Sequence, residues 1–549
     1  MFRLNWKALA PLSIGALIVL CLALAFAQRP RRVGQQQASQ KTAQGKPSVI
    51  NVKAGGDLQK AIDRAQPGDT ILLEAGASFI GPFTLPAKAS SSTLFVTIRC
   101  STPDSLLPPP GSRITPASAP LLPKLLSPGQ GLSALKTAAG AHHYRLIGIE
   151  FSTLHNTDLV YDLVALGQAT SEQSLLSQVP HHLSLDRCYL HAWPDQELKR
   201  GIALNSASTE IINCHISAIK RLADGPFGES QVIAGINGPG PFQIINNYLE
   251  GADINILFGG AAPNIADLVP SDIEIRRNLI VKPSSWRPGA GGYEGKAWVV
   301  KNLLELKTGR RVVIEGNVFE NSWQSGQDGW ALLLTVYNQE GNYAVVEDVE
   351  IANNIIRHVA GGITMRGKDV LESSRVQRVV VRNNLFEDVD GKYGEGYGRF
   401  LMVGRGTIDV RVEHNTVWHT GSIMFAGGEP NLGFVFKNNL LRLAGSGITG
   451  HARSPGNDTI RFYFPGGEFR RNVLIGLPQE PHPENNFYPR TPEAVGFVDF
   501  ARGNYRLLPG SKYKNAATDG KDIGCDFDEL DAALAWYGGS AAGRNQGRR

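Results

Sequence analysis

Cysteine is scarce in this chain, with five residues in 549. One of them, Cys21, lies in the apolar N-terminal stretch, and no two cysteines have the C-x-x-C spacing of a metal or redox pair. A disulfide framework is therefore excluded, and packing must hold the fold together. The net charge is only +5 and the basic residues are scattered, so we expect no nucleic-acid partner, although a mild positive bias favours an acidic one.

Apolar residues and glycine are abundant. Hydrophobic residues make up 42% of the chain, and 61 residues are glycine. This composition suits a large core with many tight turns, and it excludes a disordered or fibrous chain.

The N-terminus carries a targeting pattern. Arg3 and Lys7 precede an apolar run over 8–27, which ends in the A-x-A site Ala25-Phe26-Ala27. We expect a cleaved signal peptide and a secreted, periplasmic or envelope protein. The alternative is an uncleaved anchor, because the run can span a bilayer and is followed by basic residues; the membrane would then be contacted only through this segment. Residues 28–47 have the composition of a linker.

A short pattern recurs from residue 48 to residue 525: alternating β-formers, a polar corner and a second apolar stretch. Its irregular intervals exclude helical repeats of fixed geometry and favour strand coils with variable loops. The corner positions are Cys188, Cys214, Asn247, Asn278, Asn317, Asn354, Asn384, Asn415, Asn439 and Asn472.

The segment 349–367 shows how one coil is built. Val349 and Ile351 alternate with polar residues, Asn353-Asn354 supplies a corner, and Gly361-Gly362 supplies another before a third strand. Coils stacked about 4.8 Å apart would let inward asparagines at one corner form a hydrogen-bonded ladder. Cys188 and Cys214 occupy that position in neighbouring coils, either as stacked buried thiols or as a bridge.

The open ends of such a solenoid need covers. Asp57 can cap a short helix over 58–65, whose apolar face would plug the N-terminal end of the core. Residues 526–537 predict a second short helix within a C-terminal cap over 526–549, and the Gly/Arg/Gln tail that ends it is predicted to be disordered.

The ends of the array carry more specific motifs. Residues 52–59 and 66–71 at the entry, and 504–507 and 519–524 at the exit, make the chain resemble the pectin-lyase-like superfamily, particularly its bacterial envelope members. The resemblance spans roughly 49–525. It implies an all-β fold, a right-handed parallel β-helix with a short N-terminal capping helix, acting as a monomer on a polysaccharide. This architecture hosts lyases, hydrolases, epimerases and non-catalytic adhesins, so the reaction stays open.

In the superfamily, substrates lie along the third strand of each coil. Alternation predicts an outward polar stripe on those strands. Its members are Asn205, Asn237, Asn255, Glu305, Lys307, Arg366 and Arg405. We expect Asn205, Asn237 and Arg405, with Trp323, to bind substrate.

Glu305 and Lys307 share one face of a strand, and Asn255 belongs to the preceding coil. In metal-assisted lyases of this superfamily, Asn and Glu hold Ca²⁺ on the uronate while Lys and Arg act as base and acid. The resemblance thus implies Asn255 and Glu305 as calcium ligands, Lys307 as base and Arg366 as the group that stabilises developing charge. The chain departs from the family in having one carboxylate here instead of a pair, and a shorter spacing to Lys307. The alternative is an exposed salt-bridge ladder.

Other chemistries lack their motifs. The chain has no Asp-Asp pair, Gly-His-Gly, Asp-Pro-His or Asp-His strand motif, so hydrolase, epimerase and pectate-lyase signatures are missing. The pairs His142-His143 and His181-His182 are either metal ligands or simply hydrogen-bonded, and no H-E-x-x-H supports zinc. Trp286, Trp298 and Trp323 either stack on sugars or cover a coil.

Together with the resemblance, these observations predict an exported protein that cleaves an acidic polysaccharide by metal-assisted β-elimination, with Ca²⁺ as one candidate cation. The alternative is a non-catalytic glycan-binding or structural solenoid.

Overall fold

The computed structural model describes residues 46–89, 92–225, 228–337, 343–369, 374–442, 445 and 447–538. The predicted signal peptide over 1–27, nearly all of the linker over 28–47 and the tail from 539 lie outside the described residues. Within the described part of the chain, no helix has both the length and the apolar character needed to cross a bilayer.

Three long parallel sheets make up the fold. Sheet A contains β1 (Val49–Val52), β2 (Thr70–Leu73), β5 (Val96–Cys100), β8 (His142–Ile147), β11 (His181–Asp186), β14 (Ala207–Ile212), β17 (Phe242–Ile245), β20 (Ser271–Arg276), β23 (Gly309–Glu315), β26 (Val346–Ala352), β29 (Val376–Arg382), β32 (Ile408–Glu413), β35 (Val435–Lys437) and β38 (Glu468–Arg470). Sheet B contains β3 (Ser78–Ile80), β6 (Lys124–Ser127), β9 (Glu150–Thr153), β12 (Tyr189–His191), β15 (His215–Ile219), β18 (Tyr248–Gly251), β21 (Leu279–Val281), β24 (Val318–Ser322), β27 (Ile355–Val359), β30 (Leu385–Val389), β33 (Thr416–His419), β36 (Leu440–Arg442) and β39 (Val473–Ile475). Sheet C contains β4 (Phe83–Leu85), β7 (Leu135–Thr137), β10 (Asp162–Leu166), β13 (Arg200–Leu204), β16 (Gln231–Gly235), β19 (Ile254–Phe258), β22 (Leu304–Leu306), β25 (Trp330–Thr335), β28 (Gly361–Arg366), β31 (Arg399–Gly404), β34 (Met424–Gly427) and β37 (Ile448–Gly450).

Few other elements occur in the described residues. The α-helices are α1 (Leu58–Arg64), α2 (Asn457–Tyr463) and α3 (Phe527–Ala533), and the antiparallel pair is β40 (Phe497–Asp499) with β41 (Asn504–Leu507). The short 3-10 helices are η1 (Asp104–Leu106), η2 (Pro116–Leu121), η3 (Leu176–Gln178), η4 (Ser284–Trp286), η5 (Gly391–Tyr393), η6 (Pro492–Val495), η7 (Phe500–Arg502) and η8 (Ala535–Tyr537).

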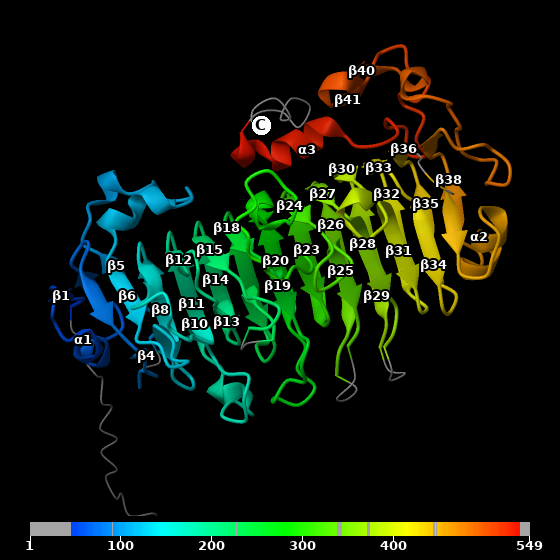
Figure 1. Cartoon of the computed structure of the whole chain (residues 1–549). Helices are drawn as coiled ribbons and strands as arrows, with labels where there is room; N and C mark the ends of the chain where they lie inside the picture. The colour runs from blue at the N-terminus through cyan, green and yellow to red at the C-terminus, as the bar shows by residue number, and fades with distance from the viewer. Residues whose placement is uncertain are drawn as a thin grey trace, which may run out of the picture. The chain divides into compact units, whose positions relative to one another are not determined.

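Each coil visits sheets A, B and C in turn, and the strands of these three sheets pair in parallel with their counterparts one coil away (Figure 1). The predicted coil over 349–367 is confirmed, since β26, β27 and β28 are its three strands. The chain is a right-handed parallel β-helix, with the handedness that parallel crossovers take. The all-β prediction is confirmed.

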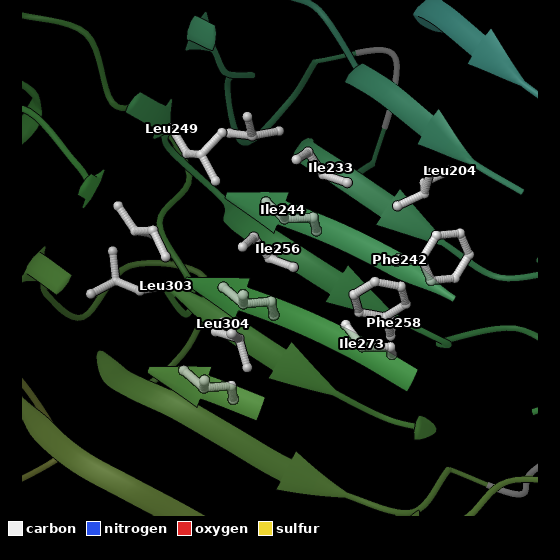
Figure 2. Packing of buried hydrophobic residues seen from close by; sticks show 14 of the residues in the cluster. Leu204, Ile233, Phe242, Ile244, Leu249, Ile256, Phe258, Ile273, Leu303 and Leu304 are labelled. Carbon is white, nitrogen blue, oxygen red and sulfur yellow. The ribbon is translucent and has the colours of Figure 1, made fainter. Parts of the chain in front are cut away.

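The core is made of stacked aliphatic and aromatic columns between the sheets. Ile233, Ile256 and Leu304 are opposite one another in sheet C and face the interior, while Phe242 of sheet A meets Phe258 of sheet C with ring centroids 5.6 Å apart (Figure 2). Each buried aliphatic side chain contributes about 1.5–3 kcal/mol, so the solenoid is stabilised by many equivalent layers.

The predicted asparagine ladder is present. Asn354 Oδ1 accepts from the backbone N–H and the side-chain amide of Asn317, at 2.9 and 3.0 Å, and Asn354 donates in the same way to Asn384. The residue before each ladder position has positive φ, as at Asn353 and Asn383. Cys188 and Cys214 continue the ladder as free, buried thiols, so the stacked alternative is confirmed.

The two ends of the solenoid are closed differently. At the N-terminal end, α1 begins at the predicted cap Asp57, which accepts from Lys60 N–H, and buries its apolar face in the core as predicted. At the other end, Tyr463 of α2 and the following Phe464 join the core.

The helix predicted at 526–537 forms, as α3 and η8, but it does not close the end. It returns along the outer face of sheet B, where Trp536 Nε1 donates to Gly316 O at 3.0 Å (Figure 1). The outward Val318, Ile355 and Leu385 of sheet B supply the apolar surface that draws it there.

We expect Asn354→Ala to lower the free energy of unfolding by about 2–4 kcal/mol, because it leaves the Asn317 N–H and the Ile314 carbonyl buried without partners. Denaturant unfolding followed by far-UV circular dichroism measures this. Asn264→Ala is the control, because Asn264 is exposed and makes a single bond to Ala169 O, so a change within about 0.5 kcal/mol is expected. Equal effects of the two variants would contradict a structural ladder.

Candidate functional site

The outer face of sheet C is organised in rows that run across the coils. Register places one residue from each strand in an outward row of mixed character: Leu257, Glu305, Leu333, Thr364, Met402 and Phe425. A parallel row holds Thr335, Arg366, Gly404 and Gly427. The rows join residues that are far apart in the sequence because each coil advances the chain by only one strand spacing.

A hollow of about 380 Å³ opens on this face over β28, β31 and β34. Arg366 and Arg405 line it together with Met402 and the ring of Phe425. The two positions that follow Arg366 in its row are glycines, so no side chain fills the space beside the guanidinium. The predicted outward orientation of Arg366 and Arg405 is thereby confirmed.

The charges in this hollow are available to an outside ligand. No ion pair joins Arg366 or Arg405 to a carboxylate anywhere in the described ranges. A larger hollow of about 690 Å³ lies over sheet A, but its arginines are bound to carboxylates, as in the pair Arg311–Asp272 at 2.6 Å. Because paired charges have less to offer a ligand, we take the sheet C hollow as the candidate site.

Glu305 lies in the outward row two coils before Thr364. Its side chain is only 1% exposed, because Leu257 and Leu333 flank it in the row, and this burial raises the pKa of its carboxyl. Lys307 Nζ lies 3.6 Å from Oε1 and 5.3 Å from the centre of the Tyr337 ring, while Oε2 has no hydrogen-bond partner among the described residues. The Glu305–Lys307 pair is therefore largely buried, and it is not the exposed salt-bridge ladder that was the alternative.

A second acidic group is buried at the edge of the same sheet, just before β19. Asp253 is fully buried and accepts from Ser230 N–H at 2.9 Å. Burial raises its pKa to about 6, against the opposing effect of Lys301, whose Nζ is 3.8 Å away. Lys301 also pairs with Glu229, so this edge carries an acid–base cluster continuous with Glu305.

The prediction that Asn255 faces outward beside Glu305 is wrong. Asn255 is fully buried, and its Oδ1 accepts from Lys282 Nζ at 2.8 Å inside the core. Lys282 Nζ also donates to the backbone carbonyls of Asp253 and Asn302, at 3.0 and 3.3 Å. Burial lowers the pKa of Lys282, and these oxygens are the groups that stabilise its ammonium form.

The residues implied as calcium ligands therefore do not form one site. Calcium takes six to eight oxygen ligands. Here the Asn255 oxygen is committed to an internal ammonium, and the groups nearest Glu305 are Lys307 and two leucines. This donor set does not fit the ion.

Asn205 and Asn237 lie at the corner that ends β13 and β16, where they serve the backbone. Asn205 Oδ1 accepts from the N–H groups of Ile236 and Asn237, and Asn237 donates to the carbonyls of Gln168 and Gln173. Both are buried, so the expectation that they lie in an outward stripe is wrong.

Trp323 is also buried, at 4% exposure. It packs with Trp286 and Trp298 in a cluster beside the solenoid, and Lys220 Nζ lies 4.4 Å from the Trp298 ring centre. The aromatic residues of the insert thus cover a coil, and their faces are not free for a sugar.

Sequence reasoning missed Phe425 and Met402. Alternation along β31 and β34 would have placed both outward, but apolar residues in an apolar strand gave no reason to single them out. Arg399, whose guanidinium carbon lies 4.9 Å from the centre of the Phe425 ring, was also missed, because its partner ring comes from the next coil and no local pattern joins the two.

The fold defines this molecule as a right-handed parallel β-helix protein with an arginine-lined hollow on one face. No protein-family model matches the sequence, and no curated protein sequence matches it.

Solved structures resemble the chain only distantly. They include an alginate lyase from Paenibacillus sp. str. FPU-7, with 14% identity, a TM-score of 0.29, and coverage of 74% of this chain and 97% of that one. They also include a mutant of the PL6 family alginate lyase AlyGC, with 14% identity, a TM-score of 0.48, and coverage of 87% of this chain and 58% of that one. The surface adhesin PfbA of Streptococcus pneumoniae shows 12% identity, a TM-score of 0.43, and coverage of 73% and 91%. At these identities the site must be interpreted from its own geometry.

The raised pKa of Glu305 predicts a pH-dependent stability. The folded chain holds the Glu305 proton more tightly than the unfolded chain, so stability falls as pH rises from the unfolded pKa of about 4.3 through the folded one. Glu305→Gln removes this loss. The difference in unfolding free energy between this variant and the unsubstituted protein should therefore move in favour of the variant as pH rises above about 4.

Denaturant unfolding at several pH values measures that gain. Glu484→Gln, at an exposed glutamate, is the control and should follow the unsubstituted protein at every pH. A Glu305→Gln difference that stays constant with pH would refute the assignment of a buried, hard-to-ionise carboxyl.

Proposed function

We propose that the outer face of sheet C binds an acidic polysaccharide, with Arg366 and Arg405 as the groups that recognise its carboxylates. The observation that carries this proposal is the hollow in which two arginines, unpaired with any carboxylate of the described residues, lie beside the apolar side chains of Met402 and Phe425. A guanidinium binds a carboxylate through two parallel hydrogen bonds, which a lysine cannot do.

The apolar lining suits the rest of a sugar ring. Phe425 and Met402 present a ring and a thioether beside the arginines, and an aromatic ring packs against the C–H face of a sugar. The rows of sheet C continue from coil to coil, so an extended chain can lie along them with its acidic groups near successive rungs. Export, expected from residues 1–27, would bring this face into contact with extracellular glycans.

Eliminative cleavage is a second, finer proposal, favoured by the position of the Glu305–Lys307 pair on the same face. Lys307 in its neutral form would take the proton from the ring carbon next to the uronate carboxylate. The electron pair left behind forms a carbon–carbon double bond as the glycosidic C–O bond breaks, and the departing oxygen takes a proton from water. Arg366 would hold the carboxylate while charge develops on it.

A buried carboxyl lies beside this base. Glu305 Oε1 is 3.6 Å from Lys307 Nζ, and burial raises the pKa of Glu305. The alternative is a glycan-binding solenoid without cleavage, in which Lys307 only binds the glycan. Asn255, a predicted ligand, is buried and bound to Lys282 instead of facing outward, and this favours the alternative.

Arg366→Ala and Arg405→Ala should each weaken binding of a uronic-acid polysaccharide by about 10- to 100-fold, because each removes a charge-assisted contact of about 1.5–3 kcal/mol. Isothermal titration calorimetry or glycan affinity electrophoresis measures this, and binding should be equal in calcium and in chelator. Arg502→Ala, at an exposed arginine of η7 paired with Asp499, is the control and should bind normally. Normal binding by both hollow variants would overturn the proposal.

Eliminative cleavage should produce a rise in ultraviolet absorbance from the new double bond when uronic-acid polysaccharides are incubated with the protein. Lys307→Ala should abolish the rise, because it removes the proposed base, while it retains binding. Lys512→Ala, at an exposed lysine, should cleave normally. Binding without any absorbance change on a broad glycan panel would reject the lyase and leave the binding module.

A further inference from the structure

Four histidines from two neighbouring coils gather near the start of sheet A, far from the hollow in sequence. His142 and His143 begin β8, and His181 and His182 begin β11, with His142 and His181 opposite each other in the register. The His142 and His181 rings stack at 5.1 Å, and the His143 and His182 rings stack at 4.5 Å. Within each coil the two Nδ1 atoms lie 2.9 and 2.7 Å apart.

Backbone conformation explains how adjacent residues meet. Successive side chains of a regular strand point to opposite faces. His143 and His182 have φ of 56° and 53°, and this left-handed conformation turns each side chain toward its predecessor. The result is a block of four rings instead of two separated pairs.

The same corner carries quite different side chains in later coils. There the left-handed positions hold Asp272, Arg311, Asp348 and Arg378, which form ion pairs from coil to coil. At that corner each charged side chain is neutralised by the opposite charge of the adjacent coil. The histidine corner is not built this way, since the charges that act on His143 are those of the other three imidazoles.

Two of the four imidazoles, those of His143 and His181, have a lowered pKa. Burial, with help from the neighbouring rings, lowers the pKa of His143 to about 4, and burial lowers the pKa of His181 as well. Neutral imidazole is the form that ligates a metal, and it suits zinc, copper and nickel.

We propose that His143, His181 and His182 form a binding site for a divalent transition metal ion that clamps the β8 and β11 coils together. One nitrogen from each of the three rings lies within 4.8 Å of the others. Ligand atoms about 2.1 Å from one ion are at most about 4.2 Å apart, so modest side-chain rotations close the site. His182 is exposed and the other two are half-buried, which leaves room for those rotations. His142, which stacks on His181, supplies a fourth imidazole beside the site.

The test uses the untagged full chain, stripped with chelator and titrated with Zn²⁺ by isothermal titration calorimetry. One ion per chain should bind, and the ion should raise the thermal unfolding temperature. The double variant His143→Ala/His182→Ala should bind at least roughly 100-fold more weakly, since even changes in the groups that support a ligand cost about 10- to 100-fold. His451→Ala, at an exposed histidine elsewhere, should bind as the unsubstituted protein does.

A second measurement does not depend on the variants folding. Electron paramagnetic resonance of the Cu²⁺-loaded chain should show coupling to at least three nitrogens. Absence of a stoichiometric site, coupling to fewer nitrogens, or equal Zn²⁺ affinity in a folded double variant would each overturn the proposal. Because these readouts are independent of any glycan, they stand apart from the proposed function.

Discussion

The asparagine ladder is the constraint on which the arrangement of this molecule depends. Each ladder amide accepts from the backbone and side chain of the preceding coil and donates to the following one, as Asn354 does between Asn317 and Asn384. The residue before it must take a left-handed conformation to turn the chain toward sheet B. This repeated corner keeps the coils in register even though their lengths vary widely, so loops of any length can leave the other corners without disturbing the sheets.

Because the coils are held in register, residues from different coils form rows on the outer face of sheet C that no single segment of the sequence contains. Glu305, Thr364 and Phe425 belong to one outward row only because the five coils that contain β22, β25, β28, β31 and β34 are stacked in phase. The hollow beside Arg366 likewise depends on glycines contributed by two later coils. A lysine inside the solenoid also stabilises one edge of sheet C. Lys282 Nζ donates to the carbonyls of Asp253, just before β19, and of Asn302, before β22. These bonds hold in place the edge that carries Asp253 and Lys301.

The residue types at the corners of the coils vary much more than those on the inward faces of the sheets. At the corner that begins sheet A, one set of coils carries alternating Asp and Arg, and an earlier set carries four histidines. A solenoid can thus hold separate sites on separate faces, because each position needs to match only its neighbours above and below.

The sequence by itself determined the coil, the ladder and the N-terminal helix, because these depend on local alternation, on corner residues and on a cap within a few positions. It also placed Arg366 and Arg405 correctly. It failed at Asn255 because alternation is broken at the start of sheet C strands: Ile254 packs outward with Leu257, whereas Asn255 and Ile256 both face inward. Leu163 and Val164, and Leu303 and Leu304, repeat this break, since a corner that turns into the sheet points two successive side chains at the core. Only the tertiary structure decided that Asn205, Asn237 and Asn255 are buried, that Trp323 is covered, and that α3 lies on sheet B, because each of these outcomes depends on a partner from a distant part of the chain.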